Sequence, residues 1–135
     1  MKATVLGFVA LAALASATLC GRSLAAEWEP VTETESAVYL IDRTSLGPAQ
    51  AVQSAWVLVT GGHGRGLEHY GSRTQLMVFD CDRRAVALKQ YALHSLPGGQ
   101  GVVLRAETYD DDKLEFSQQG PGSVGDQLLG AVCDR

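Results

Sequence analysis

Residues 70–81, YGSRTQLMVFDC, decide the fold, because they place a run of β-prone residues between a glycine-rich break and a polar turn. Met77, Phe79 and Cys81 occupy alternate positions, so their side chains are expected on one face of a strand. The Asp82-Arg83-Arg84 that follows is typical of a tight turn, in which the Asp80 carboxylate would accept hydrogen bonds from nearby backbone amides.

Three further segments are predicted as strands, because each is rich in β-branched or aromatic residues and lies between turn signals: 37–41 (AVYLI), 52–60 (VQSAWVLVT) and 85–93 (AVALKQYAL). The third also fits a helix by periodicity. It follows a turn directly and ends at Pro97-Gly98-Gly99, however, which favours a strand. Leu114 and Phe116 suggest a brief last strand.

Residues 102–109 (VVLRAETY) alternate in polarity. Apolar side chains recur at Val102, Leu104 and Ala106, and the charged side chains of Arg105 and Glu107 would lie opposite them. The pattern predicts a strand with one buried face and one face in water.

Apolar residues recur at helical spacing in residues 124–133 (VGDQLLGAVC), namely at Val124, Leu128, Leu129 and Val132. Ser123 is a good N-cap, and Asp126 can reach back as in a capping box. Cys133 projects from the same helix face as Leu129. We therefore predict an α+β domain, in which one C-terminal α-helix packs on an antiparallel sheet of about six strands.

The N-terminus has the three parts of a secretory signal peptide: a charged start at Met1-Lys2, an apolar run over residues 4–19 and the small-residue exit Ser23-Leu24-Ala25. The run of 16 residues is shorter than the roughly 20 that cross a bilayer. We predict a signal peptide over residues 1–25 and one domain over residues 26–135. The domain would be exported to the periplasm or cell surface, with no transmembrane anchor after cleavage.

Lipidation at Cys20 is the less favoured alternative, since Leu19 stands where that chemistry needs a small residue.

Cleavage of the signal peptide removes Lys2 and Arg22, so 9 basic residues remain against 15 acidic ones, a net charge of −6 with His neutral. An acidic domain repels phosphate backbones and anionic lipids, which argues against binding of nucleic acid or a membrane surface.

Two cysteines remain after cleavage, Cys81 and Cys133. In an oxidising compartment such a pair in a small domain is typical of one disulfide. A metal or redox pair is the alternative, but the chain has no C-x-x-C and neither cysteine has a histidine at close ligand spacing. We predict a Cys81–Cys133 disulfide.

The glycine-rich loop at residues 61–66 does not fit a phosphate-binding motif, because its spacing differs and predicted strands flank it. We interpret it as a hairpin loop that presents His63, Arg65 and His69 to a partner. A metal site formed by these histidines and His94 is disfavoured, since the spacing from His63 to His69 is not a zinc pattern.

No catalytic constellation stands out. Ser72 is not in a G-x-S-x-G elbow, and Asp110-Asp111-Asp112 lacks the Glu-terminated spacing of a calcium loop. We assign no residue to catalysis, to a cofactor or to a metal, and we predict that the protein is not an enzyme.

Many of these residues occur in the order of a known family: Trp28-x-x-Val31, Val38-Tyr39-x-Ile41-Asp42, Ser45-Leu46, Trp56, Ser72, Phe79-Asp80-Cys81-x-Arg83-Arg84, Tyr91, Pro121-Gly122-Ser123, Leu128-Leu129 and Val132-Cys133. Over Trp28 to Cys133 the chain resembles the surface-adhesin protein E-like family. The resemblance implies an exported β-rich domain with a helix, a disulfide between the two family cysteines, and adhesion of the named members to host matrix or serum proteins. It places Trp28, Trp56 and Phe79 in the core and transfers no binding residue.

We therefore predict an exported, non-enzymatic binding module that engages a protein partner, either of the host extracellular matrix or of the envelope, through a sheet edge or loops. An unpaired edge strand would also let two copies form a homodimer. The alternative is a periplasmic structural or stress-related envelope protein without a host ligand.

Overall fold

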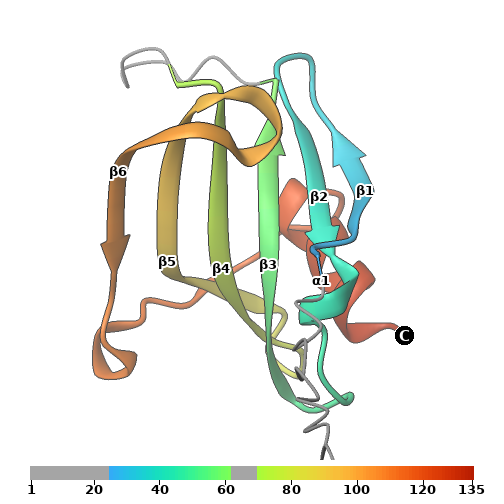
Figure 1. The fold of residues 1–135 in the computed structure, drawn as a ribbon. Helices are drawn as coiled ribbons and strands as arrows, with labels where there is room; N and C mark the ends of the chain where they lie inside the picture. The colour runs from blue at the N-terminus through green and yellow to red at the C-terminus, as the bar shows by residue number, and fades with distance from the viewer. Residues whose placement is uncertain (1–24, 62–69) are drawn as a thin grey trace, which may run out of the picture.

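Strand β4 (Ser72–Asp80) lies in the middle of an antiparallel sheet whose strand order is β1-β2-β3-β4-β5-β6, so sequence neighbours are also neighbours in space (Figure 1). The structure is a computed structural model that describes residues 25–61 and 70–135. Its other elements are β1 (Trp28–Glu33), β2 (Val38–Asp42), η1 (Arg43–Ser45), β3 (Val52–Thr60), β5 (Ala85–Leu96), η2 (Pro97–Gly99), β6 (Gln100–Thr108), η3 (Asp111–Lys113), β7 (Ser117–Gln118) and α1 (Val124–Cys133).

The predicted fold class is confirmed: an antiparallel sheet carries one C-terminal helix and one disulfide. The strands expected at 37–41, 52–60, 70–81 and 85–93 are β2 to β5, and residues 85–93 form a strand rather than a helix. The brief last strand is β7, which follows the expected Leu114 and Phe116 and pairs with the start of β5.

The core lies between the sheet and α1, which packs behind β2 and β3 in Figure 1. Met77 and Phe79 face this core, as their alternation predicts, and they meet the buried helix residues Leu128, Leu129 and Val132. The other two residues expected in the core differ, because Trp28 and Trp56 are only half-buried and lie outside this cluster.

The connection from β5 to β6 crosses the opposite face of the sheet, in front of β3 and β4 in Figure 1. The Ser72 hydroxyl donates to the Leu96 carbonyl at 2.6 Å and accepts the Gly99 N–H at 2.8 Å. A Cβ on Gly71 would lie 2.3 Å from the Leu96 carbonyl carbon, so only glycine allows this approach. These contacts fix the point at which β6 begins.

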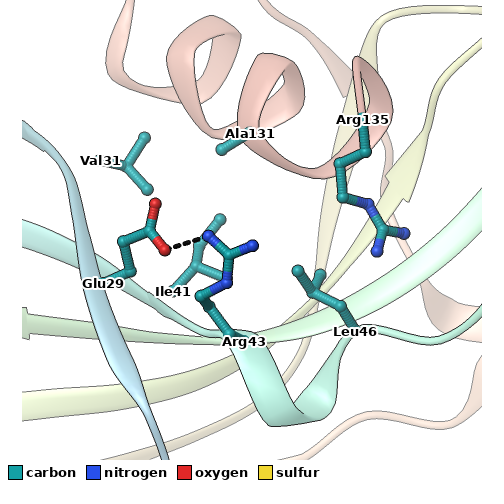
Figure 2. Close-up of a pocket in the computed structure, with 7 residues that line it drawn as sticks. All are labelled: Glu29, Val31, Ile41, Arg43, Leu46, Ala131 and Arg135. Atoms are coloured by element: carbon teal, nitrogen blue, oxygen red, sulfur yellow. Dashed lines mark hydrogen bonds and ion pairs between the residues drawn. The ribbon is translucent and has the colours of Figure 1, made fainter.

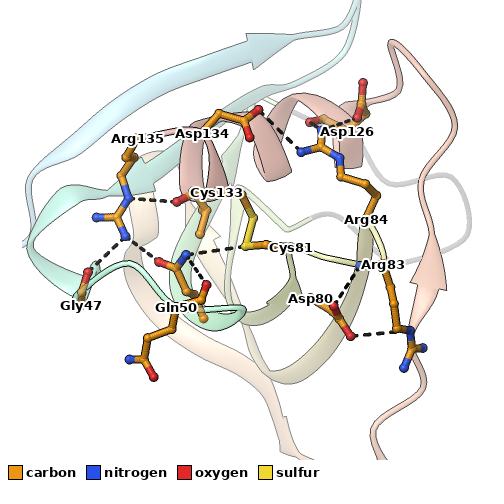
Figure 3. Close-up of a disulfide and its surroundings, with 12 residues drawn as sticks. Gly47, Gln50, Asp80, Cys81, Arg83, Arg84, Asp126, Cys133, Asp134 and Arg135 are labelled. Atoms are coloured by element: carbon orange, nitrogen blue, oxygen red, sulfur yellow. Dashed lines mark hydrogen bonds and ion pairs between the residues drawn. A yellow bond between two sulfur atoms is a disulfide. The ribbon is translucent and has the colours of Figure 1, made fainter.

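The disulfide between Cys81 and Cys133 forms as predicted and joins the end of β4 to the end of α1 (Figure 3). Asp80 takes its expected turn role, because its carboxylate accepts the Arg83 N–H at 3.1 Å. The turn between β4 and β5 is thereby held closed next to the covalent link.

Arg84 ties the same turn to both ends of α1 (Figure 3). Its guanidinium donates to Asp126 at 2.6 Å and lies 3.6 Å from the Asp134 carboxylate. The Arg84 hydrogen bond, followed by that of the Gly122 N–H, lowers the pKa of Asp126. This stabilisation is present at neutral pH and is lost as the pH falls through the lowered pKa.

The N-terminus of α1 carries the predicted cap with one difference. The Ser123 hydroxyl accepts the Asp126 N–H at 3.2 Å, as expected of an N-cap. The Asp126 carboxylate, however, accepts the N–H of Gly122 rather than that of Ser123.

The two edges of the sheet differ. Strand β1 is interrupted by an irregularity in its pairing between Pro30 and Thr32, it contains a proline, and it is the strand that α1 contacts most. Proline cannot donate to a ladder, and the helix lies against this strand, so β1 is a poor template for another strand.

Most of the predicted signal peptide, residues 1–24, lies outside the described residues. Within residues 25–61 and 70–135, no helix is both long and apolar enough to cross a membrane.

Candidate partner-binding surface

The other edge of the sheet is β6, and it exposes three consecutive apolar side chains. Val102, Val103 and Leu104 are 66%, 57% and 51% exposed, and Leu96 at the end of β5 is 53% exposed. Successive side chains of a strand point to opposite faces, so both faces of β6 present apolar groups to solvent. We call these four residues the β6 edge.

The prediction of one buried face for this strand is therefore wrong. Within residues 25–61 and 70–135, β6 pairs with β5 alone and supplies none of the core residues, because α1 packs further along the sheet on β1, β3, β4 and β5. Because no described helix or strand packs over either face of β6, its alternating apolar residues do not contact a core.

The second half of β6 carries a polar cluster on one face. Arg105, Glu107 and Tyr109 are alternate residues, and Glu107 stands opposite Tyr91 of β5 in the register. The Glu107 carboxylate accepts a bond from Arg105 at 2.6 Å and one from the Tyr109 hydroxyl at 2.9 Å. Arg73 of β4 places its guanidinium 5.7 Å from the centroid of the Tyr91 ring.

These bonds set the protonation states of the cluster. The hydrogen bond from Arg105, and then those from Tyr109 and Tyr91, lower the pKa of Glu107. The Glu107 carboxylate in turn raises the pKa of Tyr109. Glu107 is therefore an anion and Tyr109 a neutral phenol across the physiological range, which gives this end of β6 fixed donors and acceptors.

A shallow hollow of about 370 Å³ adjoins the cluster, lined by Leu88, Tyr109, Lys113 and Glu115. Its wall combines an apolar side chain, an aromatic ring and one charge of each sign. Such a lining suits the side chains of a protein partner that pairs with β6 and continues past its end.

Of the histidines and the arginine singled out from the sequence, the structure describes only His94. His63, Arg65 and His69 lie in residues 62–69, outside the described residues. His94 lies on β5, where its Nε2 is 2.8 Å from the Thr74 hydroxyl. In the part of the chain that the structure describes, no group of three His, Cys, Asp or Glu side chains is placed to hold a metal ion.

Sequence reasoning did not identify the β6 edge or the Tyr91–Glu107–Tyr109 grouping. The i, i+2, i+4 spacing of Arg105, Glu107 and Tyr109 could have indicated a shared face. The exposure of Val102 to Leu104 had no local signal, because it depends on where the helix packs.

A model of the surface-adhesin protein E family matches residues 28–134. Among solved structures, crystal form II of Haemophilus influenzae protein E superposes with a TM-score of 0.55 at 13% identity, covering 82% of this chain and 96% of that one. The selenomethionine form of the same protein gives a TM-score of 0.53 at 14% identity, with 81% and 94% covered. Protein E from non-typeable H. influenzae gives 0.51 at 13% identity, with 82% and 83% covered. No curated protein matches the chain.

Proposed function

The chain belongs to the surface-adhesin protein E family, and from this premise we propose that it is an exported, non-enzymatic binding module that engages protein partners through the β6 edge. The observation that carries the proposal is the row of exposed apolar residues, Val102 to Leu104, on a strand whose outer side pairs with no other described strand. Soluble proteins normally blunt such an edge with charge, proline or a bulge, and Val102 to Leu104 carry neither charge nor proline, although the pairing of β6 with β5 shifts register beside them.

The chemistry of recognition is strand addition. The outward backbone N–H and C=O groups of β6 would pair with an extended segment of the partner, and apolar side chains on both faces would contact that segment. The polar cluster at Arg105, Glu107 and Tyr109 would fix its register, since buried charged bonds discriminate between partners more than they add affinity.

The partners we propose are proteins of the host extracellular matrix or of the envelope. A second copy of the chain is a further partner, because the same edge can pair with itself to give a homodimer. The loop residues His63, Arg65 and His69 remain proposed contacts for a partner.

Val103→Lys is expected to weaken binding to purified extracellular matrix proteins about tenfold, because a lysine on an edge strand opposes both pairing and apolar contact. Solid-phase binding measures the effect. Val52→Lys is the matched control, since Val52 is 50% exposed and lies on β3 rather than on β6. If both variants lose binding equally, or neither does, the β6 edge is not the site.

Light scattering of the same proteins tests the homodimer. The wild type should show a concentration-dependent dimer that Val103→Lys removes and Val52→Lys retains. A strict monomer at high concentration would exclude edge pairing between copies.

Protease shaving of intact cells is expected to degrade the domain while a periplasmic control protein survives, because an adhesin must stand outside the outer membrane. An immunoblot for the domain gives the readout. Survival until the outer membrane is opened would instead favour an envelope protein of the periplasm, with its partner inside.

A further inference from the structure

A small pocket lies between α1 and the β1–β2 edge, at the side of the sheet opposite the β6 edge (Figure 2). Its apolar surface comes from Val31, Ile41, Leu46 and Ala131, of which Ile41 is buried and Ala131 points down from the helix. The pocket has a volume of about 90 Å³. A single water needs roughly 10–15 Å³ on this measure, so the space suits a branched aliphatic side chain.

Charged groups surround this apolar surface: Glu29, Arg43 and Arg135 (Figure 2). Arg43 donates to Glu29 through Nη1, so its Nε and Nη2 groups take no part in that ion pair. Both side chains are more than half exposed at the mouth of the pocket.

Arg135 differs from Arg43 because it donates hydrogen bonds to neutral oxygens. Its Nε donates to the Val132 carbonyl at 2.9 Å, and its Nη2 donates to Gly47 at 3.1 Å and to Gln53 at 2.5 Å. These bonds hold the guanidinium in place without neutralising it. Among the residues that line the pocket, two guanidinium groups therefore stand against one carboxylate, and Glu27 acts on Arg43 from outside the lining.

We propose that this pocket binds the carboxyl-terminal residue of a peptide whose last side chain is a branched aliphatic. The side chain would fill the space above Ile41, and the terminal carboxylate would accept bonds from Arg43 and Arg135. Guanidinium groups suit this role because their planar donors match a carboxylate. Binding would supply Arg135 with an anionic partner while the Glu29–Arg43 pair stays intact.

The residues of the peptide that precede its last one would contact a second hollow beside the pocket. Val31 also lines a second hollow of about 220 Å³ together with Pro30, Thr32, Glu33 and Val38, on the same edge of the sheet. This contact would be made by side chains, since the proline and the irregular pairing of β1 disfavour an added strand. The pocket thus goes beyond the function proposed for the β6 edge and can be tested separately from it.

The test is fluorescence anisotropy with a labelled hexapeptide that ends in leucine, offered as the free acid and as the carboxamide. The acid is expected to bind, and the amide to bind at least about tenfold more weakly, because it loses the charge-assisted bonds to the two arginines. Equal binding of acid and amide, or no binding of the acid at about 1 mM, would overturn the proposal. N-acetyl-leucine that binds as tightly as the hexapeptide would also overturn it, since the ligand would then be a small carboxylate.

Two variants locate the site. Ala131→Leu is expected to fill the pocket and abolish binding, while the melting temperature stays the same or rises because the added side chain buries apolar surface against Val31 and Ile41 and leucine is still a good helix former. Arg43→Gln should weaken the binding of the free-acid peptide about tenfold. Arg83→Gln is its matched control, because Arg83 is also an exposed, ion-paired arginine, at 63% exposure against 59% for Arg43.

Peptide binding that survives Ala131→Leu, or that falls equally in Arg43→Gln and Arg83→Gln, would place the peptide elsewhere and contradict the proposal. Val103→Lys should leave peptide binding unchanged, so a failure of the β6 edge and a failure of this pocket give different results.

Discussion

Replacement of Cys81 and Cys133 together by alanine is expected to lower the free energy of unfolding by about 4 kcal/mol. The disulfide joins residues 52 apart in the sequence, and breaking it returns the loop-closure entropy to the unfolded chain. The loss of stability should be largest for the packing of α1, because Cys133 is the last residue of that helix. The sheet depends less on the disulfide, since its strands pair with their neighbours in sequence. Urea unfolding followed by circular dichroism measures the change.

The control is the wild type unfolded with and without a thiol reductant. Reduction should destabilise the wild type by a similar amount and leave the double-alanine variant unaffected. A variant as stable as the oxidised wild type would show that Arg84 and the core alone hold α1 in place.

Leu129→Ala is expected to cost about 3 kcal/mol of unfolding free energy. Leu129 is fully buried in the core cluster with Phe79 and Val57, so truncation removes apolar contacts and leaves a cavity between α1 and the sheet. Thermal or urea unfolding gives the value.

Leu104→Ala makes the same chemical change at a residue that is 51% exposed on β6, and it should cost less than about 0.5 kcal/mol. The comparison is made at a concentration at which light scattering shows a monomer, and similar losses at the two positions would then mean that Leu104 is buried within the domain itself.

Much of the fold could be predicted because local pattern and tertiary contact agree. The alternation at Met77 and Phe79 and the helical spacing at Leu128, Leu129 and Val132 describe the two surfaces that meet in the core. The disulfide could be predicted for a different reason, since two cysteines in a small domain that is predicted to be exported leave few alternatives.

The strands at the edges could not be predicted in the same way. In β1, Glu29, Pro30 and Glu33 hide the strand pattern, because an edge strand needs few apolar residues and tolerates proline. In β6 the pattern is present but misleading: Leu104 and Ala106 alternate with the charged Arg105 and Glu107, yet the helix does not extend over them. Burial there is decided by the length and position of α1, which lies far away in sequence.

Neither proposed site is visible in the sequence, and for the same reason. The pocket draws Val31 from β1, Ile41 from β2, Leu46 from the loop after η1 and Ala131 from α1, so its residues meet only once the helix has packed. The β6 edge is defined by what does not cover it.

The unequal edges of the sheet also set how large an assembly can grow. Pro30 removes a backbone donor from β1 and α1 packs against that strand, so an incoming β6 pairs poorly there and a head-to-tail filament of alternating β1 and β6 contacts does not propagate. Two copies that join β6 to β6 about a two-fold axis would use up their open edges in one step. Assembly through β6 would therefore stop at two copies, and the exposed apolar strand would not start a fibre.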